Sequence, residues 1–502
     1  MQGEFDVIVV GGGGSGLAAA VRSAERGCRV LLLEKEPHLG GTTGIAVGSF
    51  TANRTRQQQQ AGIEDAHEDH AEDAGQFATS EIESRNNGPL RLYFLGETAR
   101  TMDWLLEMGL AFYGPSPEPP NRVPRMHNVV PNAKAFIATL QARLLRLGGA
   151  IQTGACVDAL IQEEGRVVGV DAALDGAEKR FRATRGVVLA GGDYANSSEI
   201  IARHKGPDFS AIEGINPNAD GRGHRLAESV GAQMVNMDVT YGPELRFVPP
   251  PGKVFEQLLP SGGLGVRILG RLLPLVPKFM IAARIKRLLV TWQHPEDALF
   301  DDGAILVNNR GERFCNEREW PAREIAVANQ PGKVCYIVLD RRLIERYSEW
   351  PRFISTAPEI AYAYVEDYLR LRPDVAVSAA TLDALASKRG LPAEALRASV
   401  DRFNQHVAGK SADAWGRGKD EHPLEGDHWV LLGPTKAWFT TTEGGAAINE
   451  RLQVLDESGA PIPGLFAVGQ NGLGGQILWS HGLHIAWALT SGRLVGEVLG
   501  ES

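Results

Sequence analysis

Apolar, glycine-rich and helical stretches follow one another at the start of the chain in the order strand, turn, helix, strand. Residues 5–10 form a β-branched apolar run, which is typical of a buried strand. The glycine-rich residues 11–16 follow, and an alanine-rich segment that favours helix then continues to Gly27. A second apolar run at residues 29–33 closes on Glu34. This order predicts a β-α-β unit.

Further apolar periodicity predicts a large mixed α/β molecule. Helical spacing recurs over residues 90–112, 133–147, 226–230, 382–408 and 483–498. Short apolar runs that favour strands lie at residues 159–161, 167–170, 186–189 and 464–469. The run at 186–189 leads into a glycine pair, as expected of a parallel strand whose carboxyl end faces a ligand.

The segment from residue 53 to 88 is polar and breaks this pattern. It contains a glutamine run at 57–60 and the sequence His-Glu-Asp-His at 67–70. Two histidines three residues apart suggest a metal site, but a solvated, charged segment is the favoured interpretation. We therefore expect no metal in this protein.

A second unusual segment spans residues 254–290. It mixes apolar and basic residues, has no acid between Glu256 and Glu296, and is interrupted by glycine and proline. One interpretation is a hairpin that contacts a membrane surface or another subunit. The other is a buried helical insert whose basic ends reach water.

Length, charge and cysteine usage narrow the class of protein. The 502 residues are 43% hydrophobic, which is enough for a large core and too many for one compact domain, so two domains are expected. The net charge of -9, with dispersed basic residues, argues against a nucleic-acid surface. The four cysteines, Cys28, Cys156, Cys315 and Cys335, are far apart and show no CxxC spacing. The sequence therefore predicts no disulfide framework, c-type haem attachment or iron–sulfur cluster.

The same features indicate where the protein works. The first strand begins at residue 5, which leaves no room for a signal peptide, and no uninterrupted apolar run reaches membrane-spanning length. We expect a reducing, cytoplasmic setting, with peripheral membrane contact only if segment 254–290 supplies it.

The glycines of the first β-α-β unit are spaced as in a dinucleotide-binding turn. Gly11 permits a tight turn, Gly13 lets the backbone approach a pyrophosphate, and Gly16 lets helix and strand pack closely. The phosphates then lie at the helix N-terminus, near Gly14 and Ser15. Glu34, about twenty residues beyond the glycines, is placed to accept hydrogen bonds from an adenosine ribose. The sequence therefore predicts a dinucleotide cofactor.

Several motifs occur together in a characteristic order. They are Gly11–Gly16 with Glu34, Gly40-Gly41-Thr42-Thr43, Asn218-Ala219-Asp220-Gly221, residues 303–308 with 311–317, and residues 461–469. Together they resemble the FAD-dependent fumarate reductase and 3-ketosteroid dehydrogenase superfamily, closer to its ketone-desaturating branch, over nearly the whole chain.

The resemblance implies a fold class and a domain layout. The fold is α/β: a glutathione-reductase-type, Rossmann-like FAD-binding domain interrupted by an α+β cap domain. The FAD-binding domain corresponds to residues 1–289 and 442–502, and the cap to residues 290–441. Family members add or remove hydrogen across a carbon–carbon bond, with the hydride carried by flavin N5.

The resemblance also implies where FAD binds. Besides the first glycine motif and Glu34, the expected cofactor residues are Lys35, Gly41, Thr42, Thr43, Gly44, Ala190, Gly191, Asp220, Gly469, Gln470 and Leu483. The covalent branch of the superfamily carries a histidine just after its second glycine pair. This chain has Thr42-Thr43-Gly44-Ile45 there, so FAD is expected to bind non-covalently.

Departures from the superfamily pattern bear on the reaction. Fumarate reductases hold a substrate carboxylate with the His of His-Thr-Met-Gly-Gly, where this chain has residues 441–445, Thr-Thr-Glu-Gly-Gly. The Arg of their Asn-Arg-Leu-Gly-Gly motif is replaced within residues 478–482, Leu-Trp-Ser-His-Gly. A dicarboxylate left unpaired in a closed site would cost several kcal/mol. An alternative function is that of an enoate or dicarboxylate reductase with Arg323 as the proton donor. Arg323 lies two residues beyond the position at which fumarate reductases carry their proton-donating arginine.

The ketone-desaturating branch offers a second set of candidate residues. It places the backbone N–H of a glycine that opens the last helix against the substrate ketone, and Gly482 falls at that position. His481 could polarise the same carbonyl. For the base that removes the α proton, Tyr194 is the first choice and Tyr113 the second, because related enzymes use tyrosine.

We therefore expect a flavin-dependent dehydrogenase that desaturates an apolar ring ketone, either a 3-ketosteroid or a cyclohexanone, beside its carbonyl. The external electron acceptor is left open. A third possibility is a non-catalytic flavin-binding scaffold whose 254–290 segment binds a membrane or a partner.

Overall fold

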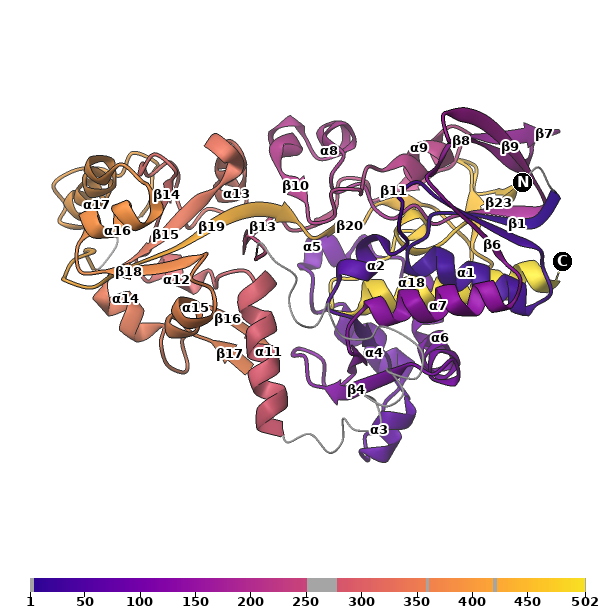
Figure 1. Ribbon diagram of the computed structural model, residues 1–502, viewed down its shortest axis with the longest axis horizontal. Helices are drawn as coiled ribbons and strands as arrows, with labels where there is room; N and C mark the ends of the chain where they lie inside the picture. The colour runs from indigo at the N-terminus through magenta and orange to yellow at the C-terminus, as the bar shows by residue number, and fades with distance from the viewer. Residues whose placement is uncertain (1–3, 251–277, 358–360, 419–421, 502) are drawn as a thin grey trace.

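The computed structural model describes residues 4–250, 278–357, 361–418 and 422–501. Figure 1 shows two bodies side by side along the long axis. One holds a large sheet, the surrounding helices and both chain termini, and the other is built around a second sheet. The mixed α/β fold predicted from the sequence is confirmed.

The large sheet contains the predicted β-α-β unit. Its strand order is β22, β23, β9, β1, β2, β6, with β8 and β7 continuing from β9. β1 pairs in parallel with β2 on one side and with β9 on the other. The bounds are β1 (Glu4–Val10), β2 (Val30–Glu34), β6 (Ala150–Thr153), β7 (Ala155–Glu163), β8 (Arg166–Leu174), β9 (Ala177–Leu189), β22 (Gln453–Leu455) and β23 (Pro461–Ala467).

Parallel pairing brings the carboxyl ends of β1, β2, β9 and β23 to one edge of the sheet. Each of these strands ends in an apolar run that is buried. Loops that are far apart in sequence therefore meet at this edge, which is where ligands bind in open α/β sheets.

Helices cover the large sheet. They are α1 (Gly14–Glu25), α6 (Gly88–Glu107), α7 (Lys134–Arg146), α9 (Arg222–Glu228) and the last helix, α18 (Leu483–Glu501). α18 packs closely on α1, because a Cβ on Gly492 would lie 2.4 Å from the carbonyl oxygen of Ser15. The glycine thus brings the last helix against the first one.

The cap sheet is organised around β19 (Trp429–Phe439), which pairs with four other strands. These are β10 (Glu213–Gly214), β13 (Glu244–Phe247), β15 (Cys335–Leu339) and β18 (Ala376–Ala379), and β14 (Ile305–Asn308) pairs with β15. β10 and β13 precede residue 290, so the cap sheet includes strands from the N-terminal side of the predicted boundary.

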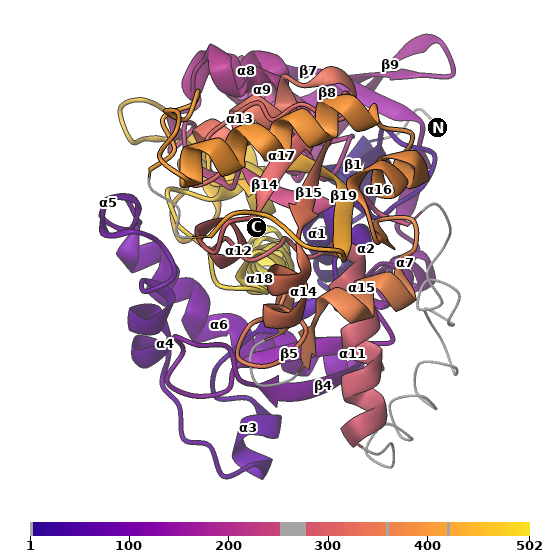
Figure 2. The same cartoon turned by 90° about the vertical axis from the view of Figure 1, so that its left-hand side faces the viewer.

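Helices also surround the cap sheet. In Figure 2, which faces the cap, α17 crosses in front of β14 and β15. The helices of this body are α11 (Lys278–Trp292), α12 (Ala298–Asp301), α13 (Ala322–Ala328), α14 (Arg341–Arg346), α15 (Val365–Leu371), α16 (Leu382–Arg389) and α17 (Ala393–Val407), with a small hairpin of β16 (Ser355–Ala357) and β17 (Ala361–Ala363).

Short elements join the two bodies and line the region between them. β12 (Thr240–Tyr241) pairs with β20 (Thr441–Thr442), directly beside the pairing of β13 with β19. A three-stranded sheet is formed by β3 (Ser49–Thr51), β5 (Met126–Val130) and β4 (Ala111–Ser116). The remaining short elements are α2 (Gly41–Ile45), α8 (Ser198–His204), β11 (Met234–Val235) and β21 (Gly445–Ala446).

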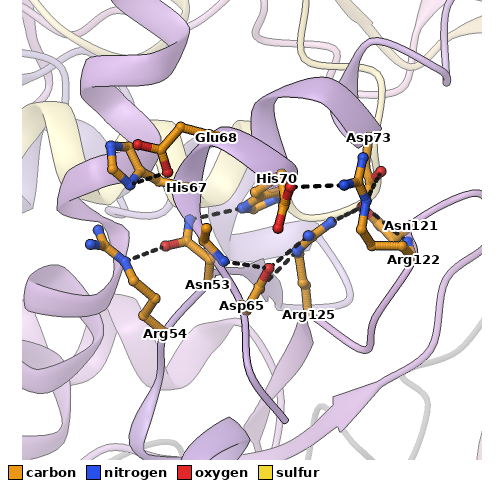
Figure 3. Close-up of polar contacts among 12 residues, drawn as sticks. Asn53, Arg54, Asp65, His67, Glu68, His70, Asp73, Asn121, Arg122 and Arg125 are labelled. Carbon is orange, nitrogen blue, oxygen red and sulfur yellow. Dashed lines mark hydrogen bonds and ion pairs between the residues drawn. The ribbon is translucent and has the colours of Figure 1, made fainter.

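The polar segment at 53–88 differs from the solvated segment that we predicted. It forms α3 (Arg56–Gln60), α4 (His67–Ala74) and α5 (Ser80–Glu83). His70 is 0% exposed and Asp73 only 4%, because α4 packs its polar face on the loop that carries Arg122 and Arg125 (Figure 3). Among the described residues, no group of His, Cys, Asp and Glu side chains is arranged to hold a metal ion.

Only part of the basic segment at 254–290 can be placed. Residues 254–277 lie outside the described residues, and the rest belongs to α11, which packs on the β16–β17 hairpin. Within the described ranges, no helix is long and apolar enough to cross a membrane.

The contact between α18 and α1 predicts a stability effect. Replacing Gly492 with Ala should lower the free energy of unfolding by about 1–3 kcal/mol, since the new methyl group clashes with backbone. The matched control is Gly88→Ala at the start of α6, where an added Cβ meets no atom within 4 Å. Thermal unfolding of both variants measures the difference, and equal midpoints would contradict the proposed packing.

Candidate active site

The first glycine motif forms a narrow turn with open space beside it. A Cβ on Gly11 would lie 2.3 Å from the carbonyl oxygen of Ala190, and one on Gly16 would lie 1.9 Å from that of Gly11. Both positions therefore require glycine. At Gly13, in contrast, the nearest atom to an added Cβ is 3.9 Å away. This space adjoins the N-terminus of α1, so the predicted pyrophosphate site fits.

Glu34 lies beside this turn at the end of β2. Its carboxylate is almost buried and accepts hydrogen bonds from the backbone N–H groups of Gly12, at 2.6 Å, and Glu36, at 2.9 Å. The neighbouring Lys35 donates to the carboxylate of Asp220 at 2.8 Å. Burial opposes the charge of Asp220, but its hydrogen bonds to Lys35 and to the N–H of Arg222 outweigh burial and lower its pKa.

Three other loops meet near the same edge of the sheet. Thr43 packs on Gly14, where an added Cβ would lie 2.6 Å from the threonine hydroxyl, and Thr42 accepts a hydrogen bond from Asn216. The N–H of Gly191 donates to Asn471, whose amide is bonded to His224.

The last of these loops follows β23. The N–H of Gly469 donates to Ser491 of α18, and the amide of Gln470 donates to β20. Leu483 is fully buried at the start of α18. The structure thus assembles the predicted FAD-binding residues from loops that span most of the sequence.

Tyr194, the first-choice base, is enclosed in the protein. Its side chain is 0% exposed, and its hydroxyl donates a hydrogen bond to the carbonyl of Met237 at 2.7 Å. Burial raises its pKa far above the ordinary value. Its ring contacts His224 edge-on. These contacts favour a packing role over proton abstraction.

Arg323 and Tyr113 lie in different bodies. Arg323 is in the cap, where its guanidinium is 5% exposed and pairs with Asp297 at 2.8 Å and Glu324 at 2.6 Å. Tyr113 is half-buried on β4, opposite Asn128 of β5. The structure does not bring these two residues together with Tyr194.

His481 is held by a buried carboxylate that the sequence analysis did not select. One oxygen of Glu118 lies 2.7 Å from Nδ1 of His481 and accepts the backbone N–H of the same residue at 2.8 Å. Its other oxygen accepts a hydrogen bond from Ser480 at 3.1 Å. The Glu118 side chain is 5% exposed, whereas the His481 ring is 61% exposed, which leaves its second nitrogen accessible.

The surroundings of His481 set its proton affinity. Desolvation by neighbouring protein atoms disfavours the charged ring, but the hydrogen bond to Glu118 and the charges of Glu118 and Glu244 favour it more strongly. The pKa of His481 is therefore raised above its ordinary value. An accessible imidazole backed by a carboxylate can accept and return a proton.

A second histidine–carboxylate pair lies one helical turn further along. His484 Nε2 is 2.8 Å from Glu443, which is fully buried and also accepts the N–H of Leu478. The Tyr241 ring packs against His484 and against Trp479, with ring centroids 6.4 Å and 5.6 Å away.

Two hydrogen-bond donors are available close to these rings. In the described part of the chain, neither the Tyr241 hydroxyl nor the Gly482 N–H has a hydrogen-bonding partner. Burial raises the pKa of Tyr241 well above its ordinary value, so the phenol keeps its proton. Gly482 has φ +86°, a conformation that favours glycine, and opens α18.

The cap contributes charges to the same region through β13. Glu244 accepts hydrogen bonds from Arg246 at 2.7 Å and 3.0 Å. Burial opposes the charge of Glu244, but Arg246, His294 and His481 together lower its pKa. The acid–base residues of the first body and the ion pair of the cap are thus electrostatically coupled.

Sequence reasoning missed Glu118, Tyr241 and Glu244. One signal was available for the first of them: an acid within the run Pro117-Glu118-Pro119-Pro120 is held in a rigid loop. Glu443 was visible only as a departure from the His-Thr-Met-Gly-Gly motif. The remaining residues carry no local pattern, because their partners are distant in sequence.

The fold and the assembled glycine loops define an FAD-dependent oxidoreductase. Residues 6–476 match the model of the FAD binding domain family, and the chain belongs to this family. The resemblance stated from the motifs and the FAD cofactor are thereby confirmed.

The curated relatives are distant in sequence, but the similarity extends over most of this chain. The chain is 24% identical to an NADH:fumarate oxidoreductase of Klebsiella pneumoniae over 93% of its length, yet it spans only 44% of that protein. It is 26% identical to a 4-oxocyclohexanecarboxylate 2-dehydrogenase of Sinomonas cyclohexanicum, covering 93% of this chain and 88% of the relative.

Solved structures share the fold. A flavocytochrome c3 fumarate reductase in its open conformation has a TM-score of 0.72 at 24% identity, over 99% of this chain and 78% of the other. The 3-ketosteroid-Δ4-(5α)-dehydrogenase of Rhodococcus jostii RHA1 has a TM-score of 0.60 at 24% identity, over 99% of this chain and 97% of the other.

The open space at Gly13 yields a direct test of the cofactor site. Gly13→Ala should place a methyl group in the space for the pyrophosphate without an internal clash, so that the protein folds but retains less FAD. Flavin absorbance of the purified variant measures the loss, and circular dichroism checks the fold. A folded variant that stays yellow with full flavin content would place the pyrophosphate elsewhere.

Proposed function

We propose that this protein removes hydrogen from the α and β carbons of a cyclic ketone. The observation that carries the proposal is the arrangement around residue 482. An accessible imidazole, backed by the buried Glu118, directly precedes the N–H of Gly482, and the Tyr241 ring packs beside Trp479 of the same loop; neither the N–H nor the Tyr241 hydroxyl is hydrogen-bonded to any other described residue. A base and two donors suited to a carbonyl oxygen are therefore neighbours.

The donors act on the carbonyl oxygen. The Gly482 N–H, at the positive end of α18, and the Tyr241 hydroxyl donate hydrogen bonds as that oxygen gains enolate character. Preorganised donors of this kind contribute about 3 kcal/mol each. They also acidify the α carbon, which prepares it for loss of a proton.

His481 receives that proton. The α C–H bond breaks, its electron pair forms the new double bond, and the β hydrogen leaves as hydride. Bound FAD supplies the hydride acceptor. Glu118 stabilises the imidazolium that results, and the accessible ring then releases the proton to solvent. This assigns the base to His481 in place of Tyr194 or Tyr113.

An uncharged ring suits the surroundings of this site. Tyr241 and Trp479 provide aromatic surface, and Leu478 lies in the same loop. Two cationic side chains of the cap are already paired with acids, Arg246 with Glu244 and Arg323 with Asp297 and Glu324. The 4-oxocyclohexanecarboxylate dehydrogenase among the relatives supports a cyclohexanone-type ring, but the substrate in its name also carries a carboxylate, so it supports the ring ketone and not the absence of charge.

Exchanging the proposed base tests the mechanism. His481→Gln should lower kcat by about 100-fold or more while FAD is retained, because the amide cannot accept the proton. Tyr194→Phe is the comparison: its buried hydroxyl donates to the Met237 carbonyl inside the protein, so activity should change little. Steady-state kinetics on flavin-loaded protein decide between the two, and the reverse pattern would return the base to Tyr194.

A substrate panel tests the reaction class. Holoprotein with an artificial electron-accepting dye should reduce the dye with cyclohexanone-type ketones or 3-ketosteroids and not with succinate. Reoxidation of reduced viologen by fumarate would instead support the reductase alternative with Arg323. Bound flavin without turnover on either panel would favour a non-catalytic scaffold.

A further inference from the structure

Glu118 begins a tight turn that Asn121 closes with two hydrogen bonds. The backbone N–H of Asn121 donates to the carbonyl of Glu118 at 2.9 Å, and its side-chain Nδ2 donates to the Glu118 carboxylate at 3.2 Å. Pro119 and Pro120 occupy the positions between them, so the turn has little freedom to lose on folding.

The other end of the Asn121 amide is held by a buried arginine. Nη1 of Arg125 donates to Oδ1 of Asn121 at 3.0 Å (Figure 3). The Arg125 side chain is 0% exposed and also pairs with Asp65 at 2.7 Å and Asp73 at 2.5 Å. These two acids are themselves buried, at 1% and 6% exposure.

This arrangement fixes which way the amide points. A guanidinium only donates and a carboxylate only accepts, so Oδ1 must face Arg125 and Nδ2 must face Glu118. A flipped amide would lose both bonds. The orientation of Asn121 is therefore set by two charged groups, one from the ion cluster and one from the active site.

We propose that Asn121, oriented by Arg125, is a positioning residue that holds the Glu118 carboxylate against the backbone and the imidazole of His481. This inference rests on the proposed role of His481 in proton transfer. The ion pairs of Arg125 with Asp65 and Asp73 are then a foundation for the acid–base pair.

The consequence for His481 follows from its charged neighbours. Glu118 faces the ring from its own body, and Glu244, Arg246 and His294 face it from the cap side. Of these, Glu118 alone is hydrogen-bonded to the ring. If Asn121 is truncated, the carboxylate can turn away, and the imidazolium loses its principal stabilisation.

Loss of the Asn121 contact also changes how activity depends on pH. As a base, His481 works only when neutral, so turnover falls as the pH drops through its raised pKa. Weaker support from Glu118 lowers that pKa and moves the acid limb of the rate profile to lower pH. It also makes the imidazole a weaker base, so the maximal rate falls.

The test measures the titration of His481 in the flavin-loaded protein by nitrogen NMR, with the signal assigned through His481→Gln. Asn121→Ala should lower the midpoint by about half a pH unit or more, in the direction of Glu118→Gln. Asn309→Ala is the control, because that exposed amide makes one bond to a backbone carbonyl of the cap.

A second pair of variants distinguishes the effect of Arg125 on the position of Asn121 from a general loss of stability. Arg125→Lys and Arg122→Lys both alter ion pairs with Asp73, but only Arg125 bonds to Asn121. Arg125→Lys should move the His481 midpoint and Arg122→Lys should not. Flavin content and circular dichroism confirm that the variants compared are folded.

The outcomes separate this inference from the proposed reaction. If Glu118→Gln shifts the His481 midpoint and Asn121→Ala does not, the positioning role is overturned. If both shift it but no ketone is oxidised by the unaltered protein, the positioning contact stands and the proposed reaction fails. A kcat profile that moves with the NMR midpoint supports both.

Discussion

Burial of the Glu118 carboxylate is the constraint around which the candidate site is organised. A carboxylate that loses its water must gain hydrogen-bond donors in return, and Glu118 obtains them from Ser480, from the backbone and ring of His481, and from Asn121. Those donors lie on two loops that are separated by more than three hundred residues. The carboxylate therefore joins the turn after β4 to the start of α18.

The same helix links the site to the cofactor cradle. α18 begins beside Gly482 and packs along α1, whose N-terminus faces the predicted pyrophosphate. The helix α18 thus connects Gly482, the proposed donor to the substrate oxygen, with the glycine turn that is predicted to bind FAD. Backbone packing therefore fixes His481 and Gly482 relative to the glycine turn at which FAD is predicted to bind.

Sequence reasoning succeeded where the physical cause is local. The first β-α-β unit was predictable because Gly11, Gly16 and Glu34 interact within one short stretch of chain. Glu118 and His481 are 363 positions apart, and no periodicity connects them. Tyr194 follows a glycine pair that the motif places near a ligand, but its side chain turns into the protein and bonds to Met237. The acids of α4 were read as solvated because their partners, Arg122 and Arg125, lie about fifty residues further on.

The strand pairs that join the two bodies have a consequence for how the cap can move. Residues 240–247 and 435–442 form two adjacent strands that are bonded to each other, first as β12 with β20 and then as β13 with β19. A double-stranded connection bends more easily across its face than it twists or slides, since sliding would break its register. Tyr241 and Glu244 lie on this connection. Any swing of the cap would therefore move the distant end of that body furthest. Tyr241 and Glu244, near the pivot, would stay close to His484 and His481.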